Sequence, residues 1–301
     1  MKSPRSLLRY AMYGLLMGGA DIIPGVSGGT MALIVGVYER LVAAISTAVS
    51  LGLALARFQF DEAWEYAREV PWGLLLPLAA GILLAVRVGA EVIPPLLSAY
   101  PQHMNGLFLG LVAASLIVPA RRIDTFTPVH GVLVVVFAAA AFALVGLPVF
   151  DRTAPGLLRV FASASVSICA MILPGISGAF LLKALGVYEP TLTALTTLDL
   201  PYVLTFCLGA AAGLGAFAKL LDWLLAHRHD ATMAALIGLI AGALRALWPW
   251  GAAERVLRLP APGEPVGSVV LLILVGLAGV GGLIWWSQRT DTPRPETTPP
   301  S

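Results

Sequence analysis

Six long apolar runs constrain this chain of 301 residues more than any other feature of its sequence. A helix that crosses a bilayer needs roughly 20 mostly apolar residues, and a chain with so many of these runs cannot bury them all in a water-soluble core. The charged residues agree, because at 12% they are about half as frequent as in soluble domains. We therefore predict an all-α polytopic integral membrane protein with spans at 72–98, 104–119, 129–148, 201–226, 232–248 and 268–286.

The rest of the composition excludes several classes of function. A formal net charge of +2 without a basic stripe does not predict a nucleic-acid partner. The two cysteines, Cys169 and Cys207, lie in apolar stretches without the spacing of a metal site or a disulfide. The sequence also has no Walker-type loop and no metal-ligand motif. We therefore predict no cofactor and no coupling to ATP within this chain.

Two further apolar regions, 7–56 and 156–198, are each interrupted by a Pro-Gly-x-Ser-Gly element. Proline lacks a backbone N–H and glycine permits positive φ, so each element is expected to end one helix and begin another. Irregular backbone is not tolerated against lipid, so we expect both breaks to be buried or to line a wet cavity. Each region is then a broken helix hairpin, re-entrant or fully spanning, with its break at Pro24-Gly25-Val26-Ser27-Gly28 or at Pro174-Gly175-Ile176-Ser177-Gly178.

The two breaks belong to an internal repeat. Segments 24–39 and 174–189, which are 150 positions apart, are identical at 8 of 16 positions, and similarity at a fixed offset indicates a repeated structural unit. A second block continues at an offset of 128, where Gly81 matches Gly209. We therefore predict two membrane repeats, 1–150 and 151–289, followed by a disordered tail rich in proline and threonine at 290–301.

Charge placement indicates how the repeats are related. A hairpin that returns to its own side, followed by three spans, leaves the chain on the opposite side, so the second repeat must be inverted. Basic residues favour the cytoplasmic side, and this topology places ten there: Lys2, Arg5, Arg9, Arg57, Arg68, Arg121, Arg122, Arg228, Arg289 and Arg294. Only four face outward: Arg152, Arg159, Arg255 and Arg258. Both termini are then cytoplasmic, in a multi-pass protein of the inner (cytoplasmic) membrane.

The helix expected to begin at Ser27-Gly28-Gly29-Thr30 is a candidate anion site. Its first turn offers free backbone N–H groups, the positive end of the helix dipole and two hydroxyls, and glycine lets a ligand approach the backbone. Ser177 and Gly178 repeat this pattern from the opposite side of the membrane. Two half-helices with their N-termini at the midplane form a recurring transporter site. The alternative is that these small residues only allow close helix packing.

Charged residues inside membrane segments are energetically expensive and usually mark the path of a substrate or an ion. Four cations could neutralise a bound anion: Arg40, Arg87, Lys183 and Arg245. A carboxylate near an anion can titrate close to neutral pH, so three carboxylates are candidates for coupling to H⁺ or Na⁺: Asp21, Glu39 and Glu189. The alternative for each residue is a snorkelling side chain or a structural ion pair.

The Gly-x-Ser-Gly sequences at 25–28 and 175–178 also suggest an intramembrane serine hydrolase. A nucleophilic serine needs a base, and the four histidines lie at predicted segment ends or in loops. Lys183 could serve Ser177, but the residue aligned with it in the first repeat is Leu33. This asymmetry disfavours a hydrolase, so we predict a transporter and not an enzyme.

A family resemblance covers nearly the whole chain. Segment 17–32, followed by Gly-Val-Tyr-Glu-Arg at 36–40, resembles the PopT-type polyprenyl-phosphate transporters, a family formerly catalogued as a domain of unknown function. The second half carries the family's Pro-Gly-Ile-Ser-Gly and Gly-Val-Tyr-Glu elements at 174–178 and 186–189. Lys183 departs from the family pattern and adds a cation that the first half lacks.

The resemblance implies transport of undecaprenyl phosphate, or a related polyprenyl phosphate, from the outer to the inner leaflet for reuse as an envelope carrier. Such a lipid has a small anionic head and a long apolar tail, so only the head needs a polar path. We expect the phosphate between the two Ser-Gly helix starts, the tail in a lateral opening, and alternating access by exchange of the two halves. The main alternative is a small-anion channel or exchanger, because paired helix N-termini suit an inorganic anion equally well.

Overall fold

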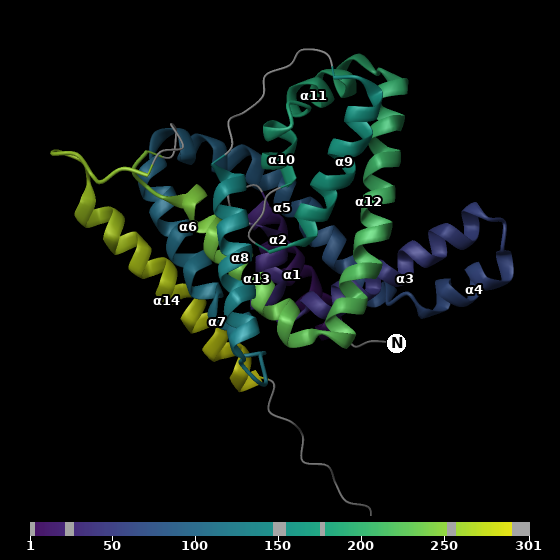
Figure 1. Cartoon of the computed structure of the whole chain (residues 1–301), viewed down its shortest axis with the longest axis horizontal. Coiled ribbons are helices and arrows are strands. Elements are labelled where there is room, and N and C mark those ends of the chain that lie inside the picture. Colours follow the sequence, from purple (N-terminus) through teal and green to yellow (C-terminus); the bar gives the residue numbers. More distant parts are fainter. Residues whose placement is uncertain (1–3, 22–26, 147–154, 175–177, 252–256, 291–301) are drawn as a thin grey trace, which may run out of the picture.

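The computed structural model describes residues 4–21, 27–146, 155–174, 178–251 and 257–290, and all regular elements in these ranges are helices. Figure 1 shows their arrangement. In chain order they are α1 (Pro4–Asp21), α2 (Gly28–Ile34), α3 (Tyr38–Ala56), α4 (Phe60–Glu69), α5 (Trp72–Ala99), α6 (Pro101–Ser115), α7 (Ile117–Ala120), α8 (Pro128–Val145), α9 (Leu157–Ile172), α10 (Gly178–Ala184), α11 (Tyr188–Thr197), α12 (Leu200–His227), α13 (His229–Ala243), the 3₁₀ helix η1 (Leu244–Leu247) and α14 (Val266–Thr290).

The described helices confirm an all-helical, polytopic membrane protein. Six segments are long and apolar enough to cross a membrane: Tyr38–Ala56, Trp72–Gly89, Pro101–Ala120, Pro128–Val145, Leu200–His227 and His229–Leu247. Five of the six overlap predicted spans, and α14 covers the remaining predicted span, 268–286. The additional segment is α3, which lies within the first broken region. Apart from Thr290, the last residue of α14, the predicted tail at 290–301 lies outside the described residues.

Each broken region contains three helices, because a second turn follows each short helix. Gly36 makes this turn between α2 and α3, and Gly186 makes it between α10 and α11. Their φ angles are 77° and 67°, a left-handed conformation that strains a residue with a side chain. Glycine therefore lets the chain turn sharply at both places. Six residues of the breaks lie outside the described residues: Pro24, Gly25, Val26, Gly175, Ile176 and Ser177.

Four pairs of helices form the body of the molecule: α1 with α5, α9 with α12, α6 with α14, and α8 with α13. In each pair a glycine lets the two backbones touch, as small residues do between membrane helices. Gly81 of α5 lies against the carbonyl oxygen of Ala11 on α1, and Gly209 of α12 lies against that of Phe161 on α9. The other two pairs have matching contacts: Gly110 with Ile273 and Gly238 with Val134. A larger residue at these glycines would separate the helices.

The helix bounds recur at the two offsets found in the sequence. α10 begins and ends 150 residues after α2, while α12 and α13 begin and end 128 residues after α5 and α6. One pair of backbone contacts follows the same offsets, because Gly209 lies against Phe161 as Gly81 lies against Ala11. The last long helix of each predicted half packs on a helix of the other half: α8 packs on α13, and α14 packs on α6. The predicted halves 1–150 and 151–289 therefore interlock.

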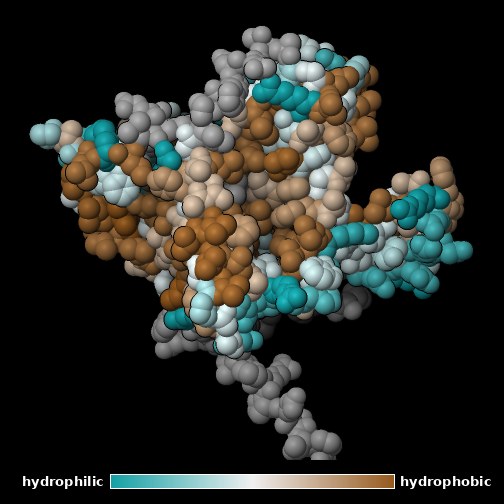
Figure 2. Space-filling model, in the orientation of Figure 1, coloured by the Kyte–Doolittle hydropathy of each residue, from teal (hydrophilic) through white to brown (hydrophobic). Residues whose placement is uncertain are grey.

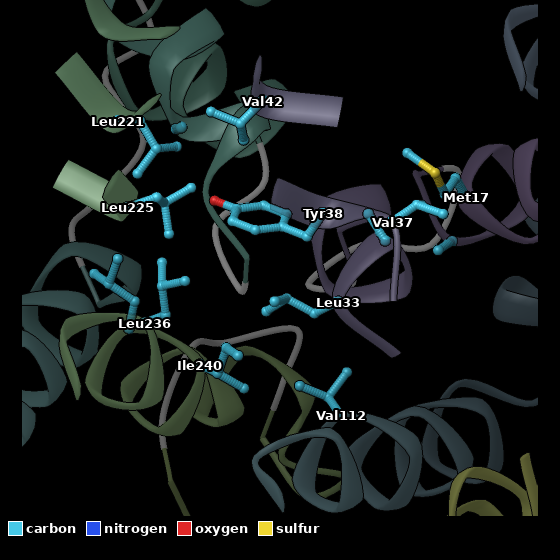
Figure 3. Packing of buried hydrophobic residues seen from close by; sticks show 14 of the residues in the cluster. Met17, Leu33, Val37, Tyr38, Val42, Val112, Leu221, Leu225, Leu236 and Ile240 are labelled. Atoms are coloured by element: carbon cyan, nitrogen blue, oxygen red, sulfur yellow. The ribbon is translucent and has the colours of Figure 1, made fainter. Parts of the chain in front are cut away.

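The apolar core gathers around α2 and the start of α3. Leu33 and Tyr38 are each about 1% exposed, and Figure 3 shows the Tyr38 ring near residues of α12 and α13 such as Leu225 and Leu236. Every residue of α2 except Met31 is buried. The short helix that follows the first break is thus enclosed by protein, as irregular backbone at membrane depth requires.

The surface has the pattern expected of lipid exposure. Leucines that a soluble protein would bury are exposed, including Leu83 on α5 at 70% and Leu271 on α14 at 61%. Figure 2 shows such apolar residues over the middle of the view, whereas hydrophilic residues gather toward its top and bottom and on α4. The α3–α4 hairpin projects from the helical body in Figure 1.

Candidate functional site

The two breaks meet at the end of α9. Ser27 caps the start of α2, where its hydroxyl oxygen accepts a hydrogen bond from the Gly29 N–H at 3.2 Å. The same hydroxyl donates to the carbonyl oxygen of Leu173 at 3.3 Å, just before the second break. A Cβ atom on Gly29 would lie 2.8 Å from the carbonyl oxygen of Ile172, so glycine is needed for α2 to begin this close to α9. An extended serine before the helix is the arrangement that an N-cap requires.

The helix after the second break begins against the same part of α9. A Cβ atom on Gly178, the first residue of α10, would lie 2.7 Å from the carbonyl oxygen of Ser167. α2 and α10 therefore start at the last two turns of α9, one from each predicted half. The structure brings together the described members of the two Ser-Gly elements, Ser27, Gly28 and Gly178, around this one helix end.

The first turn of α2 already holds a carboxyl group. The N–H of Gly28 donates to Oδ1 of Asp21, the last residue of α1, at 2.6 Å. A carboxylate at a helix N-terminus is stabilised by the free N–H groups and by the helix dipole. Ser27 and Thr30, which lie in the same turn, are only 2% and 1% exposed. The start of α2 is thus a buried polar place that accommodates a carboxyl group from its own chain.

Arg40, the first of the predicted cations, lies away from this place. Its Nη2 atom donates to the hydroxyl of Tyr10 at 3.1 Å, and its guanidinium lies 5.6 Å from the centre of the Tyr10 ring. Tyr10 is eleven residues before Asp21 on α1, which is roughly 16 Å along the helix axis. Arg40 therefore lies near the first turns of α1, far from the start of α2.

Arg87 lies at the depth of the first break. α1 and α5 run parallel and contact each other at two glycines: Gly14 beside Leu78 and Gly18 beside Ile82. Asp21 is three residues beyond Gly18, and Arg87 is five residues beyond Ile82. At 1.5 Å per residue, their positions along the helix axes differ by roughly 3 Å. The Arg87 guanidinium forms an ion pair with Glu91, one turn further along α5, and both side chains are exposed.

Lys183 and Arg245 lie on other helices, each beside an aromatic ring. The Lys183 Nζ atom is 4.7 Å from the centre of the Tyr188 ring, across the turn between α10 and α11. The Arg245 guanidinium lies 4.4 Å from the centre of the Phe142 ring, and its Nη1 atom donates to the Phe142 carbonyl oxygen at 3.1 Å. An aromatic face stabilises a nearby cation where water is scarce. The four cations are therefore distributed over the molecule instead of gathered around one helix start.

Glu39 lies in an ion-pair cluster that the sequence did not indicate. Its Oε1 atom accepts from Nη1 of Arg122 at 2.6 Å and lies 3.3 Å from Nε2 of His229. The cluster joins the start of α3, the loop after α7 and the start of α13. No spacing in the sequence signals it, because its members come from distant segments. Glu189, the equivalent of Glu39 in the second half, is exposed.

The histidines have partners away from both breaks. His103 lies 2.8 Å from the Ser268 hydroxyl, and the others pair with groups near them: His130 with Thr127, His227 with the Trp223 carbonyl oxygen, and His229 with Glu39. Ser27 uses its hydroxyl as an N-cap and as a donor to a backbone carbonyl. Among the described residues, Ser27 thus has no imidazole to activate it, as a nucleophile would require.

Comparison with known proteins identifies the family. Residues 17–261 match the family described as undecaprenyl phosphate translocase-like (VCA0040-like). The chain is 36% identical over 239 residues to a polyprenyl-phosphate transporter of Vibrio cholerae serotype O1, covering 79% of this chain and 76% of that protein. It is 30% identical over 257 residues to a polyprenyl-phosphate transporter of Staphylococcus aureus, covering 78% of this chain and 84% of that protein.

No solved structure matches the chain. The family match covers both breaks and the six helical segments of the described residues that are long and apolar enough to cross a membrane. It confirms the resemblance drawn from the motifs. This family consists of transporters, which excludes the hydrolase interpretation of the Gly-x-Ser-Gly sequences. The protein therefore belongs to the undecaprenyl phosphate translocase-like family.

Proposed function

We propose that this protein transports a polyprenyl phosphate, such as undecaprenyl phosphate, across the inner (cytoplasmic) membrane. It returns the used lipid carrier from the outer to the inner leaflet, where envelope synthesis consumes it again. Family membership and the two relatives named as polyprenyl-phosphate transporters support this function. The structural observation that carries the proposal is the meeting of the two breaks at the end of α9.

In this proposal the phosphate binds where α2 and α10 begin. Backbone N–H groups and hydroxyls at a helix start are suited to a phosphate, and they come from Ser27, Gly28, Gly29, Thr30, Ser177 and Gly178. Pro24, Gly25, Pro174 and Gly175 interrupt the helices, so that a new helix begins after each break. The long lipid tail remains in the bilayer beside the site.

Asp21 gives this site a built-in competitor. Its carboxylate already accepts the Gly28 N–H, and two anions at one helix start repel each other. Phosphate binding therefore requires that the Asp21 carboxylate leave or become neutral. This competition makes Asp21 the strongest candidate of the three carboxylates for coupling to H⁺ or Na⁺. Glu39 is held by Arg122 instead, and Glu189 is exposed.

The four cations serve the phosphate at successive depths. Arg87 lies level with Asp21, whereas Arg40 contacts the first turns of α1. In the topology proposed from the basic residues, with both termini cytoplasmic, Arg40 is nearest the cytoplasm. Lys183 lies in the last turn of α10 and Arg245 lies just after α13, both further outward in this topology. A charged head group then meets a cation on each side of the break and at its level.

The two halves are inverted and exchange conformations to give alternating access. The recurrence of helix bounds at offsets of 150 and 128 residues supports two similar halves, and the odd number of spans supports their inversion. Transporters of this kind bind the substrate between the repeats, near the midplane. The contacts between α9 and α2, which belong to different halves, agree with that position.

Purified protein in vesicles tests the function. A polyprenyl phosphate with a fluorescent tail is placed in both leaflets, and a membrane-impermeant phosphatase or quencher reports how much of it remains outside. We expect protein-dependent transfer of the phosphate but not of the matching polyprenol. Flux of chloride or inorganic phosphate without lipid transfer would support the small-anion channel instead. Equal transfer with and without pH or sodium gradients would remove the carboxylates from a coupling role.

A further inference from the structure

The hydroxyl of Ser167 on α9 is buried without a hydrogen bond. Ser167 is 3% exposed, and its Oγ atom has no partner among the residues that the structure describes. Hydroxyls in helices usually donate to the carbonyl oxygen four residues back, as Ser165 does to Phe161 at 2.9 Å. Ser167 does not make this bond. A buried hydroxyl without a partner destabilises a protein unless a ligand or water supplies one.

The position of Ser167 on α9 tells where this hydroxyl faces. α9 packs on α12 through Ser165 and Cys169, which contact the backbone of Gly209 and Gly213. Successive residues of an α-helix turn by about 100°, so Ser167 lies on the opposite side of α9 from Ser165. Besides α12, the described part of α9 contacts α10 and α2, the two helices that follow the breaks.

Ser167 is also at the right height for the site. Its carbonyl oxygen contacts the first residue of α10, and the carbonyl of Ile172, five residues on, contacts the first turn of α2 at Gly29. The buried face around Ser167 contains small residues, including Ser163 and Ala164. The unpartnered hydroxyl thus lies on the side of α9 away from Ser165, within about two turns of the places where α10 and α2 begin.

We propose that Ser167 is a phosphate-binding residue, whose hydroxyl donates a hydrogen bond to a phosphate oxygen of the bound polyprenyl phosphate. This inference rests on the proposed function and extends its site to α9, the helix between the two breaks. Without the lipid, the buried Ser167 hydroxyl lacks a hydrogen-bond partner, which is unfavourable. The phosphate supplies this partner when the lipid binds.

Three substitutions test the role of the hydroxyl. Ser167→Ala removes it, Ser167→Thr keeps it, and Ser165→Ala removes a neighbouring hydroxyl that bonds the carbonyl oxygens of Phe161 and Gly209. The probe is a short-chain polyprenyl phosphate titrated into the purified full-length protein in nanodiscs, with the matching polyprenol as the uncharged comparison. Thermal melting without lipid is measured for each variant.

We expect S167A to weaken phosphate binding about tenfold or more, as loss of a hydrogen bond to a charged group predicts. Its affinity for the polyprenol and its melting temperature should not fall. S167T should stay within about threefold of the wild type, and S165A should melt earlier with unchanged affinity.

Unchanged phosphate affinity of S167A, while the wild type binds, would overturn this inference and leave the proposed function standing. Equal losses in S167A and S167T, or an equal loss of polyprenol binding, would overturn it too, because packing would then be the cause. A change only in the sodium dependence of transport would assign Ser167 to a cation and also overturn it. If the wild-type protein binds no polyprenyl phosphate, the proposed function fails together with the inference.

Discussion

The carboxylate of Asp21 accepts a hydrogen bond from the backbone N–H of Gly28, with 2.6 Å between Oδ1 and the nitrogen. The last residue of α1 thereby occupies a donor at the start of α2, across the first break. The same donor is one that a lipid phosphate needs in the proposed site. A transporter must release its substrate as well as bind it, and an internal anion that competes for the site provides a means of release.

Asp21→Asn should strengthen phosphate binding. Asparagine keeps an oxygen that can accept the Gly28 N–H but removes the competing negative charge. We expect about three- to tenfold tighter binding of a short-chain polyprenyl phosphate, with slower net transport because release becomes limiting. Titration in nanodiscs measures the affinity, and the vesicle assay measures the rate. Weaker binding by D21N would show that the carboxylate assists the phosphate instead of competing with it.

Ser27→Ala should impair both the fold around the first break and transport. The hydroxyl caps α2 and donates to Leu173 near the second break, so its loss costs about 1 kcal/mol of stability. We expect earlier thermal melting and a clear loss of lipid transfer at an unchanged protein level. Thr47→Ala, which removes an exposed hydroxyl bonded within α3, is the matched control and should behave like the wild type. Full transport by S27A would remove Ser27 from the site.

Arg87 and Glu91 can be separated by a pair of variants. Arg87→Ala removes the cation level with Asp21, and we expect about tenfold weaker phosphate binding. Glu91→Ala frees Arg87 from its ion pair, so its affinity should equal or exceed that of the wild type. Both side chains are exposed, and neither change should lower the melting temperature much. Parallel losses in the two variants would mean that only the ion pair itself matters.

An acid-sensitive cluster of hydrogen bonds lies just before the N-terminus of α14. Glu264 accepts hydrogen bonds from the Arg258 guanidinium, the Ala261 N–H and the Gln102 amide, which together lower the pKa of its carboxyl to about 2. A lowered folded-state pKa means that the stabilisation is complete above the ordinary value of 4.5 and is lost as the pH falls toward 2.

Hydrogen exchange of residues 257–270 between pH 7 and pH 3 checks this cluster. We expect constant protection, after correction for intrinsic exchange, down to about pH 5 and a loss below about pH 4. Glu264→Gln cannot hold the charge-assisted bonds and should already be less protected at pH 7, with a weaker dependence on pH. A wild-type loss of protection that begins near neutral pH would point to a different group.

Much of the architecture follows from local sequence. Long apolar runs place α5, α6, α8, α12, α13 and α14 because a chain in hydrocarbon must satisfy its backbone hydrogen bonds within helices. The Pro-Gly elements mark where helices end, since their effect on the backbone is local. The motifs around Ser27 and Tyr38 likewise suffice to suggest the family, which the comparisons confirm. The turns at Gly36 and Gly186 were missed, because a glycine inside an apolar run has no unique local signal.

The relations between distant residues depend on tertiary packing. The sequence alone marks Ser27 and Leu173 as parts of two separate breaks, but only packing brings the Ser27 hydroxyl to the Leu173 carbonyl. It likewise pairs Glu39 with Arg122, and it buries the Ser167 hydroxyl on α9 without a hydrogen-bond partner among the described residues. A long apolar run determines that a segment is a helix in the membrane. Close glycine contacts, such as that of Gly81 with Ala11, decide which helix faces meet. The energy of such a contact depends on both helices, so neither segment reveals it by itself.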